Sequence, residues 1–265
     1  MFGIAVDDTT MAGALDAMES LIAAGGSGLV VTPNVQHVVL LQHDREFQRA
    51  YARASLVLPD SVPLVWASRL LGRPLASRVA GSDLLPEFAA RASGKGYRLF
   101  LLGAAPGVAR RAADILAARH PGLTVAGTLA PRFGFESDPA ESERIAAAVR
   151  ASSPDVVFLA LGTPKGEIWA ARHLDRLGAP LAACVGAAFD FLVGAQKRAP
   201  RWVQKIGFEW LYRLAYEPTR LWRRYILGNP YFLWLVVRFL VAPWSAPIAG
   251  GGRGVERQRP PASEA

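Results

Sequence analysis

The stretch Tyr97-Arg-Leu-Phe-Leu-Leu-Gly-Ala-Ala-Pro-Gly107 decides the fold of this chain. It is a short apolar run that ends in glycine, alanine and proline, and a longer pattern with helical spacing follows it. An apolar run of this length, bounded by turn residues, is typical of a strand that is buried on both faces. A strand of this kind followed by a helix predicts one βα unit of a parallel sheet.

The same alternation continues from residue 28 to residue 195. Six apolar runs are the predicted strands: Leu29–Val31, Leu56–Leu58, Tyr97–Leu102, Leu123–Thr128, Val156–Leu161 and Leu181–Val185. The best-marked helix start has Asp138 as the expected N-cap, Pro139 as the first helical residue and Glu141 as the capping-box partner. We therefore expect an α/β fold with a mostly parallel sheet and flanking helices.

The residues that follow the predicted strands define a candidate site. In parallel α/β sheets, ligands bind beyond the carboxyl ends of the strands, where loops and helix N-termini converge. Here these positions hold small residues, one carboxylate, one amide and one lysine, in the segments Thr32-Pro33-Asn34, Pro59-Asp60, Gly103 to Gly107, Gly162-Thr163-Pro164-Lys165 and Gly186.

The segment from Gly103 to Gly107 leaves two readings open. It is either an ordinary tight turn or a loop whose backbone N–H groups and helix dipole hold a diphosphate. It differs from the dinucleotide fingerprint, because its spacing is Gly-x-x-x-Gly and the next predicted strand ends in Gly127-Thr128, not in an acidic residue. The sequence therefore disfavours a nicotinamide-dependent dehydrogenase.

Asp60 lies at the predicted mouth of the sheet, where a partly desolvated carboxylate suits general-base catalysis. The alternative is an N-cap for the helix that begins near Val62. Thr32 and Asn34 can likewise be helix N-caps. Asn34 can also hydrogen-bond a sugar hydroxyl or the carboxylate of Asp60. Arg78 can reach a phosphate or pair with a surface acid.

The net charge is concentrated in the C-terminal quarter. Residues 196–265 carry 12 Lys and Arg against 4 Asp and Glu, whereas residues 1–195 carry 18 of each. Five of the seven tryptophans lie in the same segment, and arginine interleaved with aromatic residues is typical of a surface that contacts anionic lipid headgroups. We expect a neutral body (residues 1–195), a basic and aromatic membrane-associating appendage (residues 196–245) and a disordered tail (residues 246–265).

A different interpretation of the appendage remains open. Trp202, Ile206, Trp210 and Leu214 follow an i, i+4 spacing, which also fits a helix that packs its aromatic side on the body and exposes a basic face. Such a face could bind nucleic acid. However, the body is neutral and the basic segment runs directly into the apolar residues 231–242. An anionic membrane surface is therefore the expected partner, and nucleic acid is not.

Residues Tyr231–Ile248 are long enough to be weighed as a membrane span. Arg238 and Pro243 disfavour spanning and favour a helix in the membrane interface. Residues 1–20 have no basic start followed by an apolar stretch, which argues against a secretory signal. The single cysteine, Cys184, lies in an apolar run and is expected to be a buried structural thiol in a reducing compartment. The predicted location is cytoplasmic and peripheral, on the inner face of the cell membrane.

The sequence gives no reason to expect a metal or another cofactor. It contains no Asp-x-Asp and no His-x-x-x-His, and its four histidines show no ligand spacing. An enzyme that releases a nucleoside diphosphate without Mg²⁺ needs arginine, lysine and helix N-termini to neutralise the charge. The expected cations are Lys165, Arg78 and those of the appendage.

Several blocks of the chain resemble the WecG/TagA/CpsF family of bacterial glycosyltransferases. The longest are Val185-Gly-Ala-Ala-Phe-Asp-Phe-Leu-Val-Gly194, Lys197-Arg-Ala-Pro-Arg-Trp202, Gly207-Phe-Glu-Trp-Leu-Tyr-Arg-Leu214 and Glu217-Pro-Thr-Arg-Leu-Trp-Arg-Arg-Tyr225. The shorter ones are Thr32-Pro33-Asn34, Pro59-Asp60, Arg78 with Gly81-Ser82-Asp83, Gly103 with Pro106-Gly107, and Gly162 with Pro164-Lys165 and Glu167. The resemblance covers roughly residues 3–235.

This resemblance implies a Rossmann-like body and a C-terminal appendage that touches the membrane and helps to complete the active site. It implies inverting, metal-independent transfer of a sugar from a UDP-sugar donor to a polyprenyl-diphosphate-linked sugar acceptor. Asp60 would be the base, with Thr32 and Asn34 beside it. The other implied substrate-binding residues are Arg78, Gly103, Gly107, Gly162, Lys165, Glu167, Gly186, Arg213, Arg220, Arg223 and Arg224.

One position departs from the family pattern. Members usually have glutamine where this chain has Gly166, so a hydrogen-bond partner for the reacting sugars is absent and space is expected to open. The identity of the donor or acceptor sugar therefore stays open. Two other classes are kept as alternatives: a nucleotide-binding oxidoreductase, and a non-catalytic membrane or nucleic-acid adaptor in which Asp60 has no role.

Overall fold

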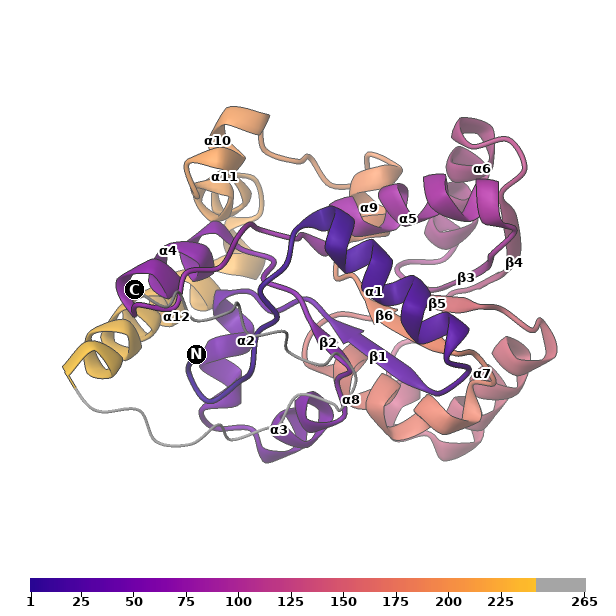
Figure 1. The fold of residues 1–265 in the computed structure, drawn as a ribbon, viewed down its shortest axis with the longest axis horizontal. Helices are drawn as coiled ribbons and strands as arrows, with labels where there is room; N and C mark the ends of the chain where they lie inside the picture. Colours follow the sequence, from indigo (N-terminus) through magenta and orange to yellow (C-terminus); the bar gives the residue numbers. More distant parts are fainter. Residues whose placement is uncertain (242–265) are drawn as a thin grey trace, which may run out of the picture.

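The computed structural model describes residues 1–241, apart from the side chains of Arg220, Arg223 and Arg224 (Figure 1). The predicted tail and the last residues of the predicted appendage lie outside the described residues.

Six parallel strands form one sheet in the order β2-β1-β6-β5-β3-β4. The strands are β1 Gly28–Val31, β2 Leu56–Val57, β3 Arg98–Gly103, β4 Thr124–Leu129, β5 Val156–Ala160 and β6 Leu181–Cys184. Every predicted strand is confirmed to within about one residue at each end. The expected α/β fold with flanking helices is confirmed as well.

Helices cover both faces of the sheet, because alternate strand residues point to opposite sides. On one face lie α1 Met11–Ala23, α5 Gly81–Lys95, α6 Val108–Arg119 and α9 Ala188–Leu192. On the other lie α3 Arg45–Ala52, α7 Pro139–Ala151 and α8 Lys165–His173, with the end of α2 Val35–Leu41. Leu101 and Phe158 face the first group, while Leu102 and Leu159 face the second. Short helical turns, η1 Phe135–Ser137 and η2 Leu174–Arg176, complete the connections.

The start of α7 confirms one prediction and corrects another. The Asp138 carboxylate accepts hydrogen bonds from the backbone N–H groups of Ala140 and Glu141 at 3.0 and 3.1 Å, as expected of an N-cap. Glu141 does not close a capping box, because its carboxylate binds Arg144. The backbone N–H of Asp138 donates instead to the carbonyl of Phe135.

The strand order reverses beside β1. The chain passes from β1 to the edge strand β2, and then crosses to β3 on the far side of β6 and β5. Crevices for ligands form at such reversals, beyond the carboxyl ends of the strands. The loops after β1, β2 and β6 therefore meet where the candidate site is expected.

The described part of the appendage consists of α10 Arg201–Lys205, α11 Glu209–Tyr216 and α12 Pro218–Val241. It does not hang free, since α12 packs on α2 and on α4 Val62–Leu70. The shared cluster is apolar and contains Met1, Phe2, Val38, Leu64, Ala67, Leu75, Phe232, Leu235 and Val236. Within it the Phe2 ring lies 5.4 Å from the ring of Phe232. The appendage and the body thus share a small hydrophobic core.

The structure does not support the alternative interpretation, in which residues 202–214 form one helix that packs its aromatic side on the body. The chain breaks at Gly207, whose φ of +71° separates α10 from α11. Trp202 is 66% exposed and Ile206 is 45% exposed, so half of the predicted ladder faces outward. Within residues 1–241, no helix has both the length and the apolar character needed to cross a bilayer.

Candidate active site

Asp60 lies between the segment after β1 and the start of α5. Its backbone N–H donates to the carbonyl of Pro33 at 2.9 Å, and the carbonyl of Pro59 accepts from the N–H of Val79 at 2.8 Å. The Asp60 carboxyl group accepts a hydrogen bond from the backbone N–H of Gly81, the first residue of α5. These contacts hold the carboxylate at the carboxyl edge of the sheet.

The N-cap alternative for Asp60 is wrong. Ser61, not Asp60, holds the N-cap position of α4, and no side chain makes a capping hydrogen bond to this helix. Burial raises the pKa of Asp60 from 3.8 to about 6; Arg78 opposes this rise, while Glu209 and Asp83 add to it. A carboxyl group with a pKa near neutrality can take a proton from a hydroxyl more effectively than an ordinary aspartate can.

Thr32 is buried and donates its hydroxyl to the carbonyl of Cys184 at 3.0 Å, so it ties β1 to β6 and is not a helix cap. A Cβ on Gly81 would lie 3.0 Å from the Thr32 hydroxyl oxygen and 2.9 Å from the Cα of Val185. The start of α5 therefore approaches these strand ends as closely as only glycine allows. Asn34 does act as an N-cap, because its side chain accepts from the N–H groups at the start of α2.

Arg78 stands at the centre of a group of alternating charges that we call the Asp60 cluster: Asp60, Arg78, Asp83, Arg198 and Glu209. One Arg78 nitrogen lies 3.5 Å from a Glu209 oxygen and 3.9 Å from an Asp83 oxygen. Arg198 holds the Asp83 carboxylate with two hydrogen bonds of 2.5 and 2.8 Å. Because Arg198 and Glu209 belong to the appendage, this cluster joins the appendage to the body at the Asp60 carboxylate.

The sequence predicted Ser82 or Asp83 as the cap of α5, but Ala80 holds the N-cap position and no side chain caps the helix. It assigned no catalytic or binding role to Asp83, Arg198 or Glu209. All three occur in the blocks that resemble the family, which was the only available signal. Their pairing could not be predicted, because Asp83 and Arg198 are 115 residues apart in the chain.

Arg213 is the second appendage arginine that reaches the body. Its guanidinium lies 5.4 Å from the ring centre of Phe191, and one of its nitrogens donates to Gln196 at 3.2 Å. Arg198 lies 5.9 Å from the same ring. The Nε atoms of Arg198 and Arg213 are buried and have no hydrogen-bond partner within the described residues. Two buried arginine N–H groups beside α9 thus lack a hydrogen-bond partner in the described part of the chain.

Arg220, Arg223 and Arg224 fall within α12, but their side chains lie outside the described part of the structure. Their assignment to the diphosphates stays a prediction.

We call the loops at the carboxyl edge of the sheet the rim. Several glycines of the rim have open space beside them. Gly107, with a φ of +82°, precedes α6, and Gly162 and Gly186 also have positive φ values. A Cβ at any of these three would meet no atom within 4 Å. At Gly103 the reason for glycine is different, since a Cβ there would lie 2.5 Å from the carbonyl oxygen of Ala160.

The structure does not bring Lys165 into the Asp60 cluster. The Lys165 ammonium forms an ion pair with Glu136 and lies 4.9 Å from the ring centre of Phe133. Hydrogen bonding from Lys165 lowers the pKa of Glu136. Phe133 itself is 97% exposed. Lys165 therefore lies at the part of the rim formed by the loops after β4 and β5.

Glu167 is buried behind the rim, in a chain of hydrogen bonds that we call the His37 chain. The Nδ1 atom of His37 lies 2.7 Å from the Tyr51 hydroxyl, and its Nε2 atom lies 2.7 Å from the Thr163 hydroxyl. Thr163 in turn donates to Glu167 at 3.2 Å. These contacts join α2, α3 and the loop before α8, which favours a positioning role for Glu167.

Gly166 does not open the space that the sequence comparison led us to expect. It is buried, and a Cβ at this position would lie 3.3 Å from the Cβ of Leu161. The first atom of any side chain at position 166 would therefore be in tight contact with Leu161.

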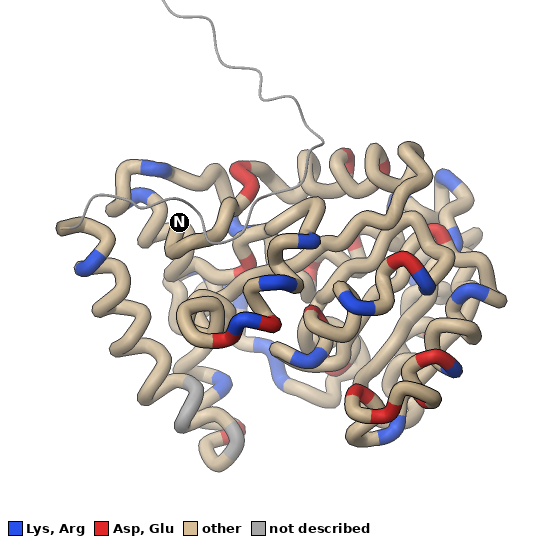
Figure 2. Tube along the Cα trace, turned by 90° about the horizontal axis from the view of Figure 1, so that it is seen from below, with Lys and Arg blue, Asp and Glu red and all other residues tan. Residues whose placement is uncertain are grey.

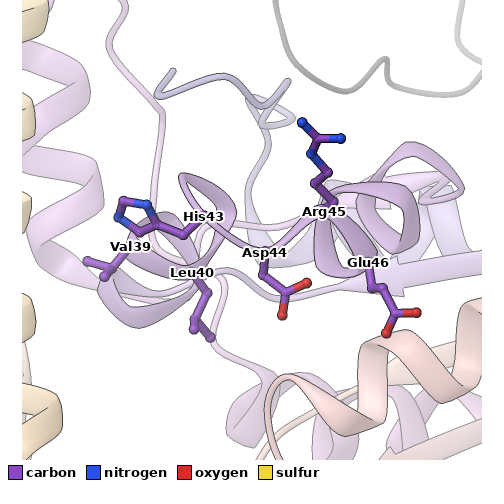
Figure 3. A pocket seen from close by; sticks show the side chains of 6 residues that line it. All are labelled: Val39, Leu40, His43, Asp44, Arg45 and Glu46. Carbon is purple, nitrogen blue, oxygen red and sulfur yellow. The ribbon is translucent and has the colours of Figure 1, made fainter.

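A surface hollow of about 550 Å³ lies at the corner between α2 and α3, lined by Val39, Leu40, His43, Asp44, Arg45 and Glu46 (Figure 3). It shares no residue with the Asp60 cluster. Its Asp44 side chain caps α3, and the ring of His43 packs on Tyr231 of α12 at 5.4 Å. These contacts give Asp44 and His43 structural roles. Within residues 1–241, no three His, Cys, Asp or Glu side chains are grouped to hold a metal ion.

The geometry places a buried carboxyl group with a raised pKa, and arginine side chains near it, at the carboxyl edge of a parallel α/β sheet. Comparison with known proteins specifies the class. The pattern described as "Glycosyl transferase WecG/TagA/CpsF family" matches residues 1–245. The chain belongs to this family and is a glycosyltransferase, which sets aside the oxidoreductase and adaptor alternatives.

Three similar proteins carry the name N-acetylglucosaminyldiphosphoundecaprenol N-acetyl-beta-D-mannosaminyltransferase. The protein from Bacillus spizizenii is 32% identical over 209 residues, which cover 79% of this chain and 78% of the relative. The Bacillus subtilis protein is 30% identical over 205 residues, covering 77% of both chains. The Staphylococcus aureus protein is 27% identical over 240 residues, covering 90% of this chain and 91% of the relative.

Proposed function

We propose that this protein transfers N-acetylmannosamine from a UDP-sugar to N-acetylglucosamine carried on a polyprenyl diphosphate, in the synthesis of a cell-surface polymer. The names of the relatives from Bacillus and Staphylococcus support the choice of sugar and acceptor. The observation that carries the proposal is the Asp60 carboxylate, with its pKa raised to about 6, at the carboxyl edge of the sheet beside Arg78.

The proposed reaction is a single displacement. Asp60 accepts the proton of the acceptor hydroxyl, whose oxygen forms a bond to the anomeric carbon of the donor sugar. The bond between that carbon and the diphosphate oxygen breaks on the opposite face, and UDP leaves with the electron pair. A displacement from the opposite face inverts the anomeric configuration.

The departing UDP needs positive charge and hydrogen-bond donors. Arg78, Arg198 and Arg213 supply both, and the buried Nε atoms of the last two are donors with no protein partner in the described residues. Arginine suits this task because its planar fork matches phosphate oxygens. Arg220, Arg223 and Arg224 are proposed to join them from α12. In this mechanism no metal ion is required.

The appendage is proposed to bind the cytoplasmic face of the membrane, where the lipid-linked acceptor resides. Its exposed side chains include Trp202, Trp222, Leu233 and Trp234. A lipid surface can cover such apolar side chains while arginines contact the headgroups, whereas a nucleic-acid backbone would leave them uncovered. The body, the appendage and the tail remain the proposed divisions of the chain.

Replacing Asp60 tests the proposed base. Asp60→Asn keeps the shape of the side chain, and we expect it to lower kcat about a hundredfold or more, measured as transfer to a lipid-linked N-acetylglucosamine acceptor. Asp114→Asn is a matched control, because Asp114 is an exposed carboxylate on α6 that pairs with Arg110. Near-native turnover by Asp60→Asn would refute the base assignment.

The donor and the metal requirement are tested separately. With the same acceptor, UDP-N-acetylmannosamine should outperform UDP-N-acetylglucosamine and UDP-glucose, and the rate should persist in EDTA. A preference for UDP-glucose would overturn the proposed sugar and leave the enzyme class intact. Loss of activity in EDTA that Mg²⁺ restores would overturn the proposed metal independence.

A further inference from the structure

The exposed apolar side chains of this protein gather at one end. Among the described residues, the large apolar side chains that are exposed in the body are Trp66, Leu70 and Phe133, and all the others belong to the appendage. Trp66 and Leu70 both lie on α4, where they are 46% and 65% exposed. Two of the three exposed large apolar side chains in the described body therefore lie on α4.

Helix α4 is fixed to the appendage. Its buried residues Leu64 and Ala67 belong to the same core cluster as Phe232 and Leu235 of α12. Its Trp66 ring approaches the break between α10 and α11, since a Cβ on Gly207 would lie 3.0 Å from that ring. Figure 1 shows α4 beside α10, α11 and α12 at the same end of the molecule. The four helices therefore present their outer sides as one unit.

The outer side of α12 carries many exposed apolar side chains. Trp222, Ile226, Leu233, Val237 and Leu240 recur at helical spacing and form a stripe, and the exposed Arg238 lies next to Val237 in the chain. In Figure 2, α12 is the long helix at the left end, with few charged segments along its described length. The exposed apolar side chains of α4 extend the apolar surface of the appendage onto the body.

The charges on α4 favour an anionic lipid surface as the occupant. The segment from Val62 to Arg73 contains Arg69 and Arg73 and no acidic residue, and both arginines are exposed. Tryptophan, leucine and arginine on one short helix are typical of a helix at a membrane interface. A second copy of the chain would instead bring two pairs of these arginines together.

We propose that α4 is a second membrane contact, in which Trp66 and Leu70 enter the headgroup region of an anionic bilayer together with the outer face of α12. This inference rests on the proposed membrane association of the appendage. It has a consequence for catalysis, because α4 begins two residues after Asp60 and has 9 residues. A helix of that length spans about 14 Å, so α4 holds the base within about one helix length of the lipid surface.

The test uses the full-length chain and Leu70→Glu. Leu70 is mostly exposed, so the melting temperature should not change. Binding to vesicles of phosphatidylglycerol and phosphatidylcholine, measured by co-sedimentation, should weaken about tenfold, because a carboxylate replaces an inserting leucine and repels the anionic surface. Leu70→Phe should bind like the wild type.

Ala118→Glu is the matched control, since it adds the same charge to an exposed position of α6, away from the appendage (Figure 1). A direct readout is an environment-sensitive dye on Leu70→Cys, which labels selectively because the only native cysteine, Cys184, is buried. The dye should shift to shorter wavelength on vesicles, and the same dye on Ala118→Cys should not.

The assay also separates this inference from the proposed function. Leu70→Glu should transfer sugar to a short-chain, water-soluble acceptor at the wild-type rate and lose activity only on vesicle-embedded acceptor. Failure of the wild type on both acceptors would defeat the proposed function. Unchanged vesicle binding by Leu70→Glu, or a change in oligomeric state alone, would overturn the role of α4.

Discussion

At the scale of single residues, the raised pKa of Asp60 sets the pH dependence of the reaction. The base acts only when ionised, so kcat/KM should fall as the pH drops through about 6. Glu209→Gln removes a negative charge that raises this pKa, and it also frees Arg78 to stabilise the carboxylate. We expect the acid limb of the pH–rate profile to move to lower pH in Glu209→Gln and to stay in place in Asp114→Asn. An unmoved limb would mean that Asp60 is not the titrating group.

The same pKa makes a prediction about stability. Burial raises the pKa of folded Asp60 from 3.8 to about 6, so the folded protein favours the protonated carboxyl. The stability contributed by this proton is present below pH 3.8 and is lost as the pH rises through about 6. Asp60→Asn removes the cost of the buried charge and should raise the free energy of unfolding at pH 8 by about 1 to 3 kcal/mol. Urea unfolding at pH 8 and at pH 5 measures this, and the gain should shrink at the lower pH.

At the scale of elements, the His37 chain joins three segments behind the rim. Burial raises the pKa of Tyr51, so its hydroxyl keeps its proton and can donate to His37. The Thr163 hydroxyl then accepts a hydrogen bond from His37 and donates one to Glu167. The donor and acceptor role of each hydroxyl in the His37 chain is thereby defined. The His37 chain thus fixes the loop before α8, which contains Gly162, and the start of α8 at Lys165 relative to α2 and α3.

Thr163→Val tests this chain, because it keeps the shape of the side chain and removes the shared hydroxyl. It should destabilise the protein by about 1 to 3 kcal/mol, since buried polar groups lose a partner. We also expect kcat to fall more than the KM for the donor changes, because the loop is displaced while the nucleotide still binds. Thr163→Ser should restore both. Wild-type stability and kcat in Thr163→Val would show that the chain has no positioning role.

The elements that could be predicted are those with local signals. The strands were predictable because each is an apolar run closed by turn residues, and Asp138 because its cap and the following proline are adjacent in sequence. The break at Gly207 had a signal, the glycine itself, but the apolar ladder around it favoured one helix. The contacts of Arg198 with Asp83 and of Lys165 with Glu136 had none, since they depend on how distant elements pack. The position of Asp60 at the sheet edge could be predicted. The rise in its pKa could not, because it depends on the residues that bury the carboxyl group and surround it in the folded protein.

At the scale of the whole molecule, the appendage has two faces with different tasks. Its inner face completes a core with the N-terminal residues, α2 and α4, so the position of the appendage relative to Asp60 is fixed by packing. Its outer face carries the exposed apolar side chains and is proposed to meet lipid. Two leucines of α12 that are two positions apart represent these faces, because Leu235 is fully buried and Leu233 is 64% exposed.

Leu235→Ala and Leu233→Ala therefore separate packing from membrane binding. Leu235→Ala should cost about 2 to 5 kcal/mol of unfolding free energy through the cavity it leaves, and hydrogen exchange should increase first in α12. Leu233→Ala should change stability by less than about 0.5 kcal/mol and weaken vesicle binding several-fold, because only the lipid contact is lost. Urea unfolding and vesicle co-sedimentation of the two variants measure both effects. If both variants lost stability equally, or if Leu233→Ala bound vesicles like the wild type, the division of α12 into a packing face and a lipid face would be wrong.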